Sequence, residues 1–215
     1  MEPAPTLAAT LDTLLAGCGA TAALEAPVRR RLVAFVQLLA KWNRVWNLTA
    51  VRDPDQMLER HVLDSLGLLP FVDEAPRLDG VPDLLDIGSG AGLPVLPLAI
   101  ARPGLACVSV ERTGKKARFQ RQAVLELGLD RVRVRADRIE DVGQRASIVT
   151  SRAFTAPEAF LQLAAAHVAP GGRALVMLGR AERLPERLPA PFELDRLHRL
   201  EARHERHVAV CIART

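Results

Sequence analysis

The fold of this 215-residue chain is decided at Asp86-Ile87-Gly88-Ser89-Gly90-Ala91-Gly92, a glycine-rich stretch that directly follows the apolar pair Leu84-Leu85. Glycine at every second position allows close approach of a ligand to the backbone, because no Cβ stands in the way. A dinucleotide-binding turn has the pattern G-x-G-x-x-G and would need glycine at position 93, which is Leu93. The spacing G-x-G-x-G is the form used by methyltransferases that bind S-adenosylmethionine (AdoMet). A tight turn without a ligand is the alternative for this stretch taken alone.

Strand and helix patterns alternate from residue 83 onward, which predicts an α/β fold with a mostly parallel sheet covered on both faces. The expected parallel strands are 83–87, 106–110, 131–136, 147–151 and 173–178, and the expected helices are 93–101, 114–128 and 156–169. Stretches 192–200 and 207–213 are expected to add antiparallel strands. Residues 1–72 have helical periodicity. We therefore expect an N-terminal helical subdomain at 1–76 and an AdoMet-binding methyltransferase domain at 77–215.

Candidate cofactor ligands occur where successive parallel strands end, which is where ligands bind in open α/β sheets. Glu111 ends the second strand, about twenty residues past the glycines, and its carboxylate can accept from both ribose hydroxyls. The third strand ends near Asp137, Ile139 and Glu140, where acidic groups can read an adenine amino group and Ile139 can pack on the ring. Arg152 follows the fourth strand. Each acid alone is better explained as a solvated strand end or helix cap, but acids at consecutive strand ends indicate a nucleoside site.

A second polar group lies in the helical N-terminal part of the chain. Asp53 and Pro54 predict the start of a helix that carries Arg60, His61, Asp64 and Ser65, so that Arg60 neighbours Asp64 at the i,i+4 spacing. An i,i+4 ion pair is usually an ordinary surface feature, and a single histidine is more often structural than catalytic. The polar cluster nevertheless interrupts strongly apolar helices, and the same is true of Asn43 and Asn47, which lie beside Trp42 and Trp46.

Composition is that of an ordinary globular protein, with 49% hydrophobic and 25% charged residues. We expect no membrane span, no signal peptide and no metal site, and three cysteines without ligand spacing favour the cytoplasm. Only three of the 29 basic residues are lysine. Arginine suits RNA contacts, although a GC-rich genome is the more ordinary explanation for its frequency. Signatures of serine hydrolases, zinc proteases and P-loop kinases are missing from the sequence.

Several motifs together resemble the bacterial small-subunit ribosomal RNA methyltransferase family called RsmG or GidB. The match runs collinearly from about residue 29 to 178 and includes the following segments: Lys41-Trp42-Asn43, Asn47-Leu48-Thr49, Val51-Arg52-Asp53-Pro54, Arg60-His61-Val62-Leu63-Asp64-Ser65, Asp86–Pro94, Gly114-Lys115-Lys116 and Ser151-Arg152-Ala153-Phe154. The resemblance implies a class I AdoMet-dependent methyltransferase fold (Rossmann-like, seven-stranded) with an N-terminal helical extension. It also implies methylation of guanine N7 in a decoding-region loop of bacterial 16S rRNA, on free rRNA or on the small ribosomal subunit.

The sequence motifs and the family resemblance together predict which residues form the site. The AdoMet site is expected at Gly88, Gly90, Gly92, Leu93, Glu111, Asp137, Ile139, Glu140 and Arg152, with Glu111 where aspartate is common in the family. Positioning roles in catalysis are expected for Arg60, Asp64 and Arg152, and substrate contacts for Asn47, Arg60, His61, Ser65, Lys115 and Lys116. Trp42 or Phe154 is expected to stack on a base. Val95 departs from the glycine common at that position in the family.

Three other functions compete with this interpretation. A nicotinamide oxidoreductase would need glycine at position 93 and a catalytic Lys, Tyr or His, whereas the chain has Leu93 and no tyrosine. A non-catalytic RNA-binding or assembly factor would keep the fold without transfer, which the intact glycines, Glu111 and Arg152 disfavour. A methyltransferase with another acceptor is the strongest alternative. We expect a monomer.

Overall fold

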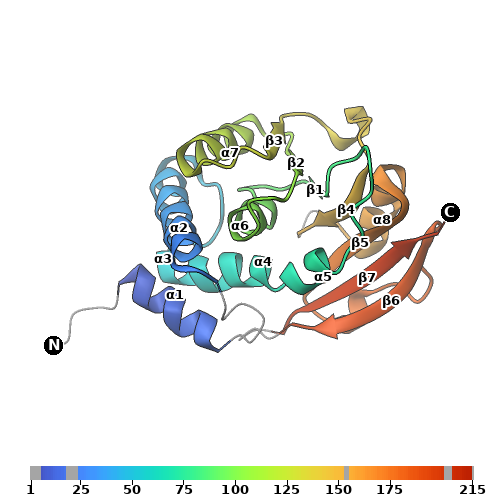
Figure 1. Ribbon diagram of the computed structural model, residues 1–215, viewed down its shortest axis with the longest axis horizontal. Helices are drawn as coiled ribbons and strands as arrows, with labels where there is room; N and C mark the ends of the chain where they lie inside the picture. Colours follow the sequence, from blue (N-terminus) through green and yellow to red (C-terminus); the bar gives the residue numbers. More distant parts are fainter. Residues whose placement is uncertain (1–5, 18–23, 153–154, 201–204, 215) are drawn as a thin grey trace.

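The chain folds around a seven-stranded sheet with the strand order β3-β2-β1-β4-β5-β7-β6 (Figure 1). The structure is a computed structural model, and it describes residues 6–17, 24–152, 155–200 and 205–214. Strands β1 to β5 are parallel, and β7 pairs antiparallel with both β5 and β6. Their bounds are β1 (Leu84–Ile87), β2 (Cys107–Val110), β3 (Val132–Arg135), β4 (Ala146–Ser151), β5 (Val168–Leu178), β6 (Phe192–Arg199) and β7 (His207–Ala213). The expected Rossmann-like methyltransferase fold is confirmed.

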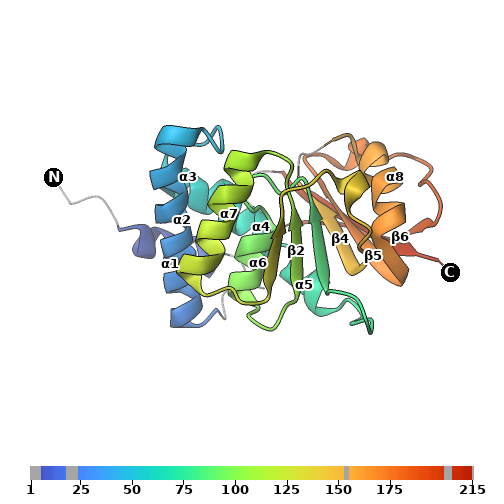
Figure 2. The ribbon, with the colours of Figure 1, turned by 90° about the horizontal axis from the view of Figure 1, so that it is seen from above.

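Helices cover both faces of the sheet. The helical elements are α1 (Leu7–Ala16), α2 (Ala26–Trp46), α3 (Pro54–Met57), the π-helical turn η2 (Leu58–Leu63), α4 (Asp64–Leu66), α5 (Leu69–Asp73), α6 (Val95–Ala101), α7 (Gly114–Leu127), the 3-10 turn η3 (Ile139–Asp141), α8 (Pro157–His167) and the 3-10 turn η4 (Ala181–Arg183). Figure 2 shows α6 and α7 on one face, with α1 and α2 outside them, and α8 on the other face.

The N-terminal helices share a hydrophobic core with one face of the sheet. One cluster of buried apolar side chains includes Phe35 of α2 and Phe119 of α7, together with residues of α4, α6 and the sheet. The ring centroids of Phe35 and Phe119 lie 6.3 Å apart, and those of Trp42 and Phe119 lie 5.7 Å apart. Trp42 therefore packs against the core, and the expectation that it stacks on a base stays a prediction. Phe154, the other ring considered, lies outside the described residues.

Strand order places a ligand crevice between the two halves of the sheet. From β1 the chain adds β2 and β3 on one side, and it then returns to add β4 and β5 on the other side. Loops at the carboxyl ends of β1 and β4 consequently diverge, which opens a binding crevice at this switch point. The glycine-rich turn after β1 and Arg152 after β4 both lie at that point.

The structure differs from the sequence prediction in two local details. Strand β5 begins at Val168, so Pro170-Gly171-Gly172 lies within the strand and a register shift in its pairing with β4 accommodates this segment. The helix expected to start at Pro54 does start there, with the Asp53 carboxylate accepting from the Asp55 N–H at 2.8 Å, but it continues as the π-helical turn η2. Within the described ranges, no helix is long and apolar enough to cross a membrane.

Candidate active site

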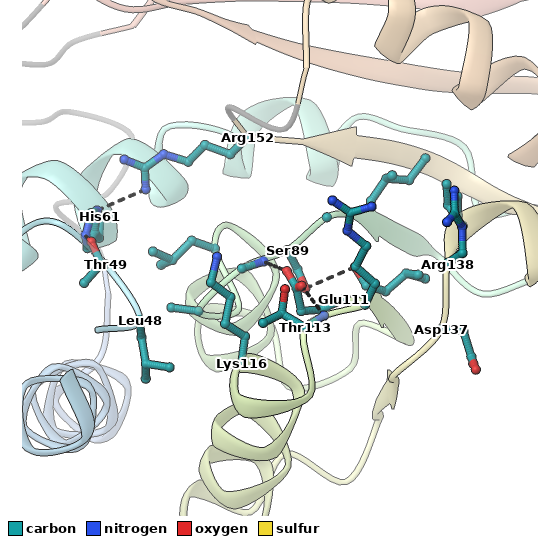
Figure 3. A pocket seen from close by; sticks show the side chains of 18 of the residues that line it. Leu48, Thr49, His61, Ser89, Glu111, Thr113, Lys116, Asp137, Arg138 and Arg152 are labelled. Carbon is teal, nitrogen blue, oxygen red and sulfur yellow. Dashed lines mark hydrogen bonds between the residues drawn. The ribbon is translucent and has the colours of Figure 1, made fainter. Parts of the chain in front are cut away.

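A cavity of about 490 Å³ opens at the carboxyl ends of β1, β2 and β3 (Figure 3). Its wall brings together residues from the glycine-rich turn, from the ends of three strands and from the N-terminal helices. The predicted site residues that line it are Gly88, Gly90, Leu93, Glu111, Asp137, Ile139, Glu140, Arg152, His61 and Lys116. The cavity therefore unites most of the cofactor ligands that the sequence predicted with two of the predicted substrate contacts.

The glycine turn leaves space for a ligand at Gly90 and uses Gly92 for packing. Gly90 has a φ of +57°, and a Cβ placed there would meet no atom within 4 Å. Gly92 has a φ of +79°, and a Cβ there would lie 2.4 Å from the Cδ1 atom of Leu96. Gly90 therefore leaves open space in the cavity wall, whereas Gly92 allows the following helix to pack against the turn.

A buried polar network, which the sequence did not predict, holds the glycine turn in place. The Gln120 side chain of α7 donates from Nε2 to the Ser89 hydroxyl and to the Gly90 carbonyl, at 2.8 Å in both cases. Ser89 also hydrogen bonds Ser109 of β2 at 2.6 Å, and Ser109 donates to Gln120 Oε1. A fully satisfied buried network of this kind rigidifies the backbone it contacts, and here it orients the turn that lines the cavity.

Glu111 is oriented toward the cavity by two backbone donors. Its Oε2 accepts from the Gly90 N–H at 2.8 Å and its Oε1 accepts from the Thr113 N–H at 2.7 Å, while only 6% of the residue is exposed. Each carboxylate oxygen retains a further acceptor position after one hydrogen bond. The carboxylate can therefore bind the backbone and still accept from two neighbouring hydroxyl groups of a ligand.

Another part of the cavity wall combines an apolar surface with acidic groups at the end of β3. Ile139 is buried and lines the cavity, next to Asp137 and Glu140. Asp137 pairs with Arg135 at 2.7 Å, and Glu140 lies 3.6 Å from Arg138. An aliphatic side chain flanked by acceptors suits a purine ring with an exocyclic amino group, and the role expected for these residues stays a prediction.

Asp86 lies beneath the glycine turn as a completely buried carboxyl group. Its Oδ2 accepts from the Val95 N–H at 3.4 Å, and its Oδ1 has no hydrogen-bond partner. Burial raises the pKa of Asp86 well above its ordinary value, and the nearby Glu111 carboxylate raises it further. The group is therefore favoured in its neutral, protonated form.

His61 is a neutral histidine with both ring nitrogens engaged. Its Nδ1 lies 3.3 Å from Nη1 of Arg152, and its Nε2 lies 2.8 Å from the Thr49 hydroxyl (Figure 3). Because a guanidinium group can only donate, Nδ1 is the acceptor, and we assign the proton to Nε2. Burial and the charge of Arg152 lower the pKa of His61 to about 4. The ring therefore orients Arg152 rather than exchanging protons near neutral pH.

Arg152 joins the sheet to the helical extension. Besides His61, its guanidinium donates to the Arg60 carbonyl and lies 3.4 Å from Oδ2 of Asp64. The same Asp64 oxygen accepts from Arg206 at 3.1 Å, and the Asp64 side chain is 3% exposed. Three segments that are distant in the chain thus meet around the buried carboxylate of Asp64. The guanidinium group of Arg152 is held by three acceptors: the Asp64 carboxylate, the His61 ring and the Arg60 carbonyl.

The i,i+4 spacing predicts that Arg60 and Asp64 lie side by side as an ion pair, and this prediction is wrong. Asp64 pairs instead with Arg152 and Arg206. Arg60 belongs to η2, and its residue is exposed. A π-helical turn bonds i to i+5, so residues four apart no longer stack as they do in an α-helix. This local geometry separates the two side chains and leaves the Arg60 carbonyl, rather than its guanidinium, in contact with the site.

Other predicted substrate residues occupy different places. Asn47 is the exposed, left-handed C-cap of α2, Ser65 is fully buried with its hydroxyl donating to the His61 carbonyl at 2.6 Å, and Lys115 is exposed outside the cavity that Lys116 lines. The buried Asn43 has a supporting function: its side chain accepts from the Thr49 N–H at 2.9 Å and donates to the Val51 carbonyl at 3.0 Å.

The loop supported by Asn43 carries Leu48 and Thr49 into the cavity wall, and neither was predicted as a site residue. A left-handed residue after a long helix predicts a change of chain direction, but the sequence does not show where the loop then goes. Among the described residues, no group of three or more His, Cys, Asp and Glu side chains has the arrangement of a metal site.

Comparison with protein families gives a match over most of the chain. The family model described as rRNA small subunit methyltransferase G matches residues 29–188. The chain is 48% identical over 157 residues to the ribosomal RNA small subunit methyltransferase G of Alkalilimnicola ehrlichii, covering 72% of this chain and 67% of the relative. It is 45% identical over 200 residues to the protein of that description from Aromatoleum aromaticum, covering 90% and 91%.

Solved structures support the fold. TrmN from Thermus thermophilus superposes with a TM-score of 0.56 at 23% identity, covering 73% of this chain and 53% of that one. The S-adenosylmethionine-dependent methyltransferase SibL in its apo form gives a TM-score of 0.58 at 17% identity, covering 88% and 70%. At these identities the likeness concerns the architecture alone.

Proposed function

Because this chain belongs to the rRNA small subunit methyltransferase G family, we propose that it transfers a methyl group from S-adenosylmethionine to N7 of a guanine in bacterial 16S rRNA. The observation that carries the proposal is the cavity at the switch point of the sheet, in which the glycine turn, Glu111 and Ile139 converge. The family predicted from the sequence motifs is the family that the comparisons show. We further propose that the enzyme acts in the cytoplasm, as a monomer, on 16S rRNA or the small ribosomal subunit.

The residues of the first cavity fit S-adenosylmethionine. Glu111 would accept from the ribose hydroxyls, Ile139 would contact the adenine ring and Asp137 or Glu140 would accept from its amino group. The open space at Gly90, where a Cβ would meet nothing within 4 Å, allows the backbone to contact the ligand closely. When bound, S-adenosylmethionine supplies a methyl group on a positively charged sulfur, which is open to attack by a nucleophile.

The site contains a positioning apparatus, and the chemistry requires no strong general base. Guanine N7 carries an in-plane lone pair and needs no deprotonation before it attacks a methyl group. His61, the histidine that lines the cavity, is not free to act as a base, because both of its nitrogens are already engaged, by Arg152 and Thr49. The enzyme therefore accelerates transfer by proximity and orientation, with Arg152 as the positioning residue that His61 holds.

Positive charge develops on the base as N7 is alkylated, so acceptor groups near the acceptor site favour transfer. The carboxylate of Asp64 is one candidate for this stabilisation, but Arg152 and Arg206 already contact its Oδ2 and neutralise much of its charge. Backbone carbonyl groups around Ser151, at the end of β4, are therefore the better candidates for this stabilisation.

Methyl transfer to RNA tests the proposal directly. Small ribosomal subunits and 16S rRNA that lack the modification would be incubated with the protein and radiolabelled S-adenosylmethionine, and then digested to nucleosides. We expect label in 7-methylguanosine from a single site, and much less with the Glu111→Gln variant as a control. Label in another nucleoside would show a different acceptor. Binding of S-adenosylmethionine without labelled RNA would favour a non-catalytic RNA-binding or assembly factor.

A further inference from the structure

A second cavity, of about 290 Å³, adjoins the first at the carboxyl ends of β4 and β5. Arg152 lines both cavities, so a ligand in either one meets the same guanidinium group. The second cavity also contains Ser151, the last residue of β4, and Leu178, the last residue of β5. None of the residues expected to hold the cofactor lines it except Arg152, which leaves its occupant unassigned.

The polar side of the second cavity carries excess positive charge. Arg152, Arg183 and Arg206 line it together with Asp64, which amounts to three guanidinium groups and one carboxylate. Asp64 accepts from Arg152 and Arg206 through Oδ2, whereas Arg183 lies exposed in the 3-10 turn η4. Because one carboxylate cannot neutralise three guanidinium groups, the cavity favours an anionic ligand, and arginine is particularly suited to phosphate.

Most of the remaining wall is apolar, apart from Ser151 and Thr155. Its apolar part includes Phe160 of α8, Val176 and Leu178 of β5, and Pro157, and the first three of these residues are buried. An apolar surface beside a phosphate-binding rim suits a nucleotide, since a base is flat and largely apolar on its faces and its phosphates carry the charge. The chemistry of the wall thus matches one nucleotide of a polynucleotide better than a small metabolite anion.

We propose that the second cavity receives the acceptor nucleotide of the rRNA. The base lies against Phe160 and Val176, and a flanking phosphate lies at Arg183 and Arg206. This inference rests on the proposed function, and it adds the acceptor side of the reaction to the cofactor side. Since Arg152 borders both cavities, a base held in the second cavity is next to the methyl donor held in the first. The target base must leave its stack to enter, as bases do in other enzymes that modify them.

Kinetics of Arg183 variants test this placement, because the exposed side chain can be removed without disturbing Asp64. Relative to wild type, we expect Arg183→Ala to raise the KM for small ribosomal subunits about tenfold, with kcat nearly unchanged, because a charge-assisted contact to phosphate is lost. The slope of log KM against log salt should fall by about 1. Arg183→Lys should recover much of the affinity, since it retains the charge. Arg206→Ala should raise the KM and also lower kcat, because it removes a partner of the carboxylate that holds Arg152.

Arg187→Ala is the matched control, because Arg187 is an exposed arginine four positions further along that lines neither cavity. The dissociation constant for S-adenosylmethionine, measured by calorimetry, should be the same for wild type, Arg183→Ala and Arg187→Ala. If Arg183→Ala behaves like Arg187→Ala while the wild type still forms 7-methylguanosine, the placement of the acceptor is wrong and the proposed function stands. If the wild type labels no RNA, the proposed function fails and this inference fails with it.

Discussion

Replacing His61 with asparagine should make the protein more resistant to mild acid than the wild type. His61 is buried between Thr49 and Arg152, and its pKa is lowered to about 4 from an ordinary value of 6.5. Asparagine retains a side-chain acceptor near the position of Nδ1, so it can still accept from Arg152. It does not titrate, and the variant therefore isolates the contribution of the imidazole to the pH dependence of stability.

The sign follows from proton binding. Between pH 6.5 and 4 the unfolded histidine binds more protons than the folded one, so the free energy of unfolding falls as the pH falls. From the two pKa values of His61, the wild type should lose about 2.5 kcal/mol between pH 7.5 and pH 4.5 through this residue alone. Asp86, whose pKa is raised, has the opposite dependence, losing stability as the pH rises. Its contribution is common to both proteins and cancels in their difference.

Urea unfolding followed by circular dichroism at pH 7.5 and pH 4.5 measures the effect. The two free energies of unfolding of the wild type should differ by about 2.5 kcal/mol more than those of the His61→Asn variant. Equal losses in the two proteins would refute the assignment of a neutral histidine held by Arg152. A larger loss in the variant would show that His61 is stabilised in its charged form.

Four further substitutions test other parts of the site, and the two glycine variants are compared with each other. Gly92→Ala should destabilise the protein by about 3 kcal/mol, because φ is positive and the Cβ would clash with Leu96. Gly90→Ala also has a positive φ but no clash, so it should lower the free energy of unfolding in urea by only about 1 kcal/mol. Equal costs would contradict the packing argument. Glu111→Gln should lower the free energy of unfolding by about 1–3 kcal/mol, since one of the two backbone donors loses its acceptor. It should also weaken binding of S-adenosylmethionine about tenfold, measured by calorimetry. Unchanged binding would exclude a ribose contact. Arg152→Lys should lower kcat for methyl transfer at least tenfold, because a single ammonium group cannot replace a planar fork that reaches three acceptors; full activity would remove Arg152 from the positioning apparatus.

Local patterns located much of the wall of the first cavity. The glycine spacing at Gly88, Gly90 and Gly92 predicted a strand-to-helix turn, and Glu111 was expected at the next strand end; the structure places Gly88, Gly90 and Glu111 in one cavity. Parallel strands make such predictions possible, because their carboxyl ends meet at one edge of the sheet. The role expected for each residue toward a ligand stays a prediction, as does the boundary between the helical and methyltransferase parts of the chain.

Residues in the helical extension were located less well. Periodicity placed Arg60 and Asp64 on one face of a helix, but the π-helical turn changed their relation. Asn47 was selected for its polarity near the tryptophans, whereas its neighbours Leu48 and Thr49 enter the cavity. A capped helix end predicts that the chain turns, and the direction it then takes depends on the hydrogen bonds that Asn43 makes across the loop.

The amino-acid sequence by itself determined the order of strands and helices, the glycine turn and the family, because these depend on periodicity, turn residues and motifs that lie close together in the chain. Only the tertiary structure decided that Asp64 holds Arg206 from 142 positions away, that His61 is neutral between Thr49 and Arg152, and that a second cavity opens beside the first. Ion pairs between distant segments, burial and cavity shape arise when the layers pack together, and no local pattern encodes them.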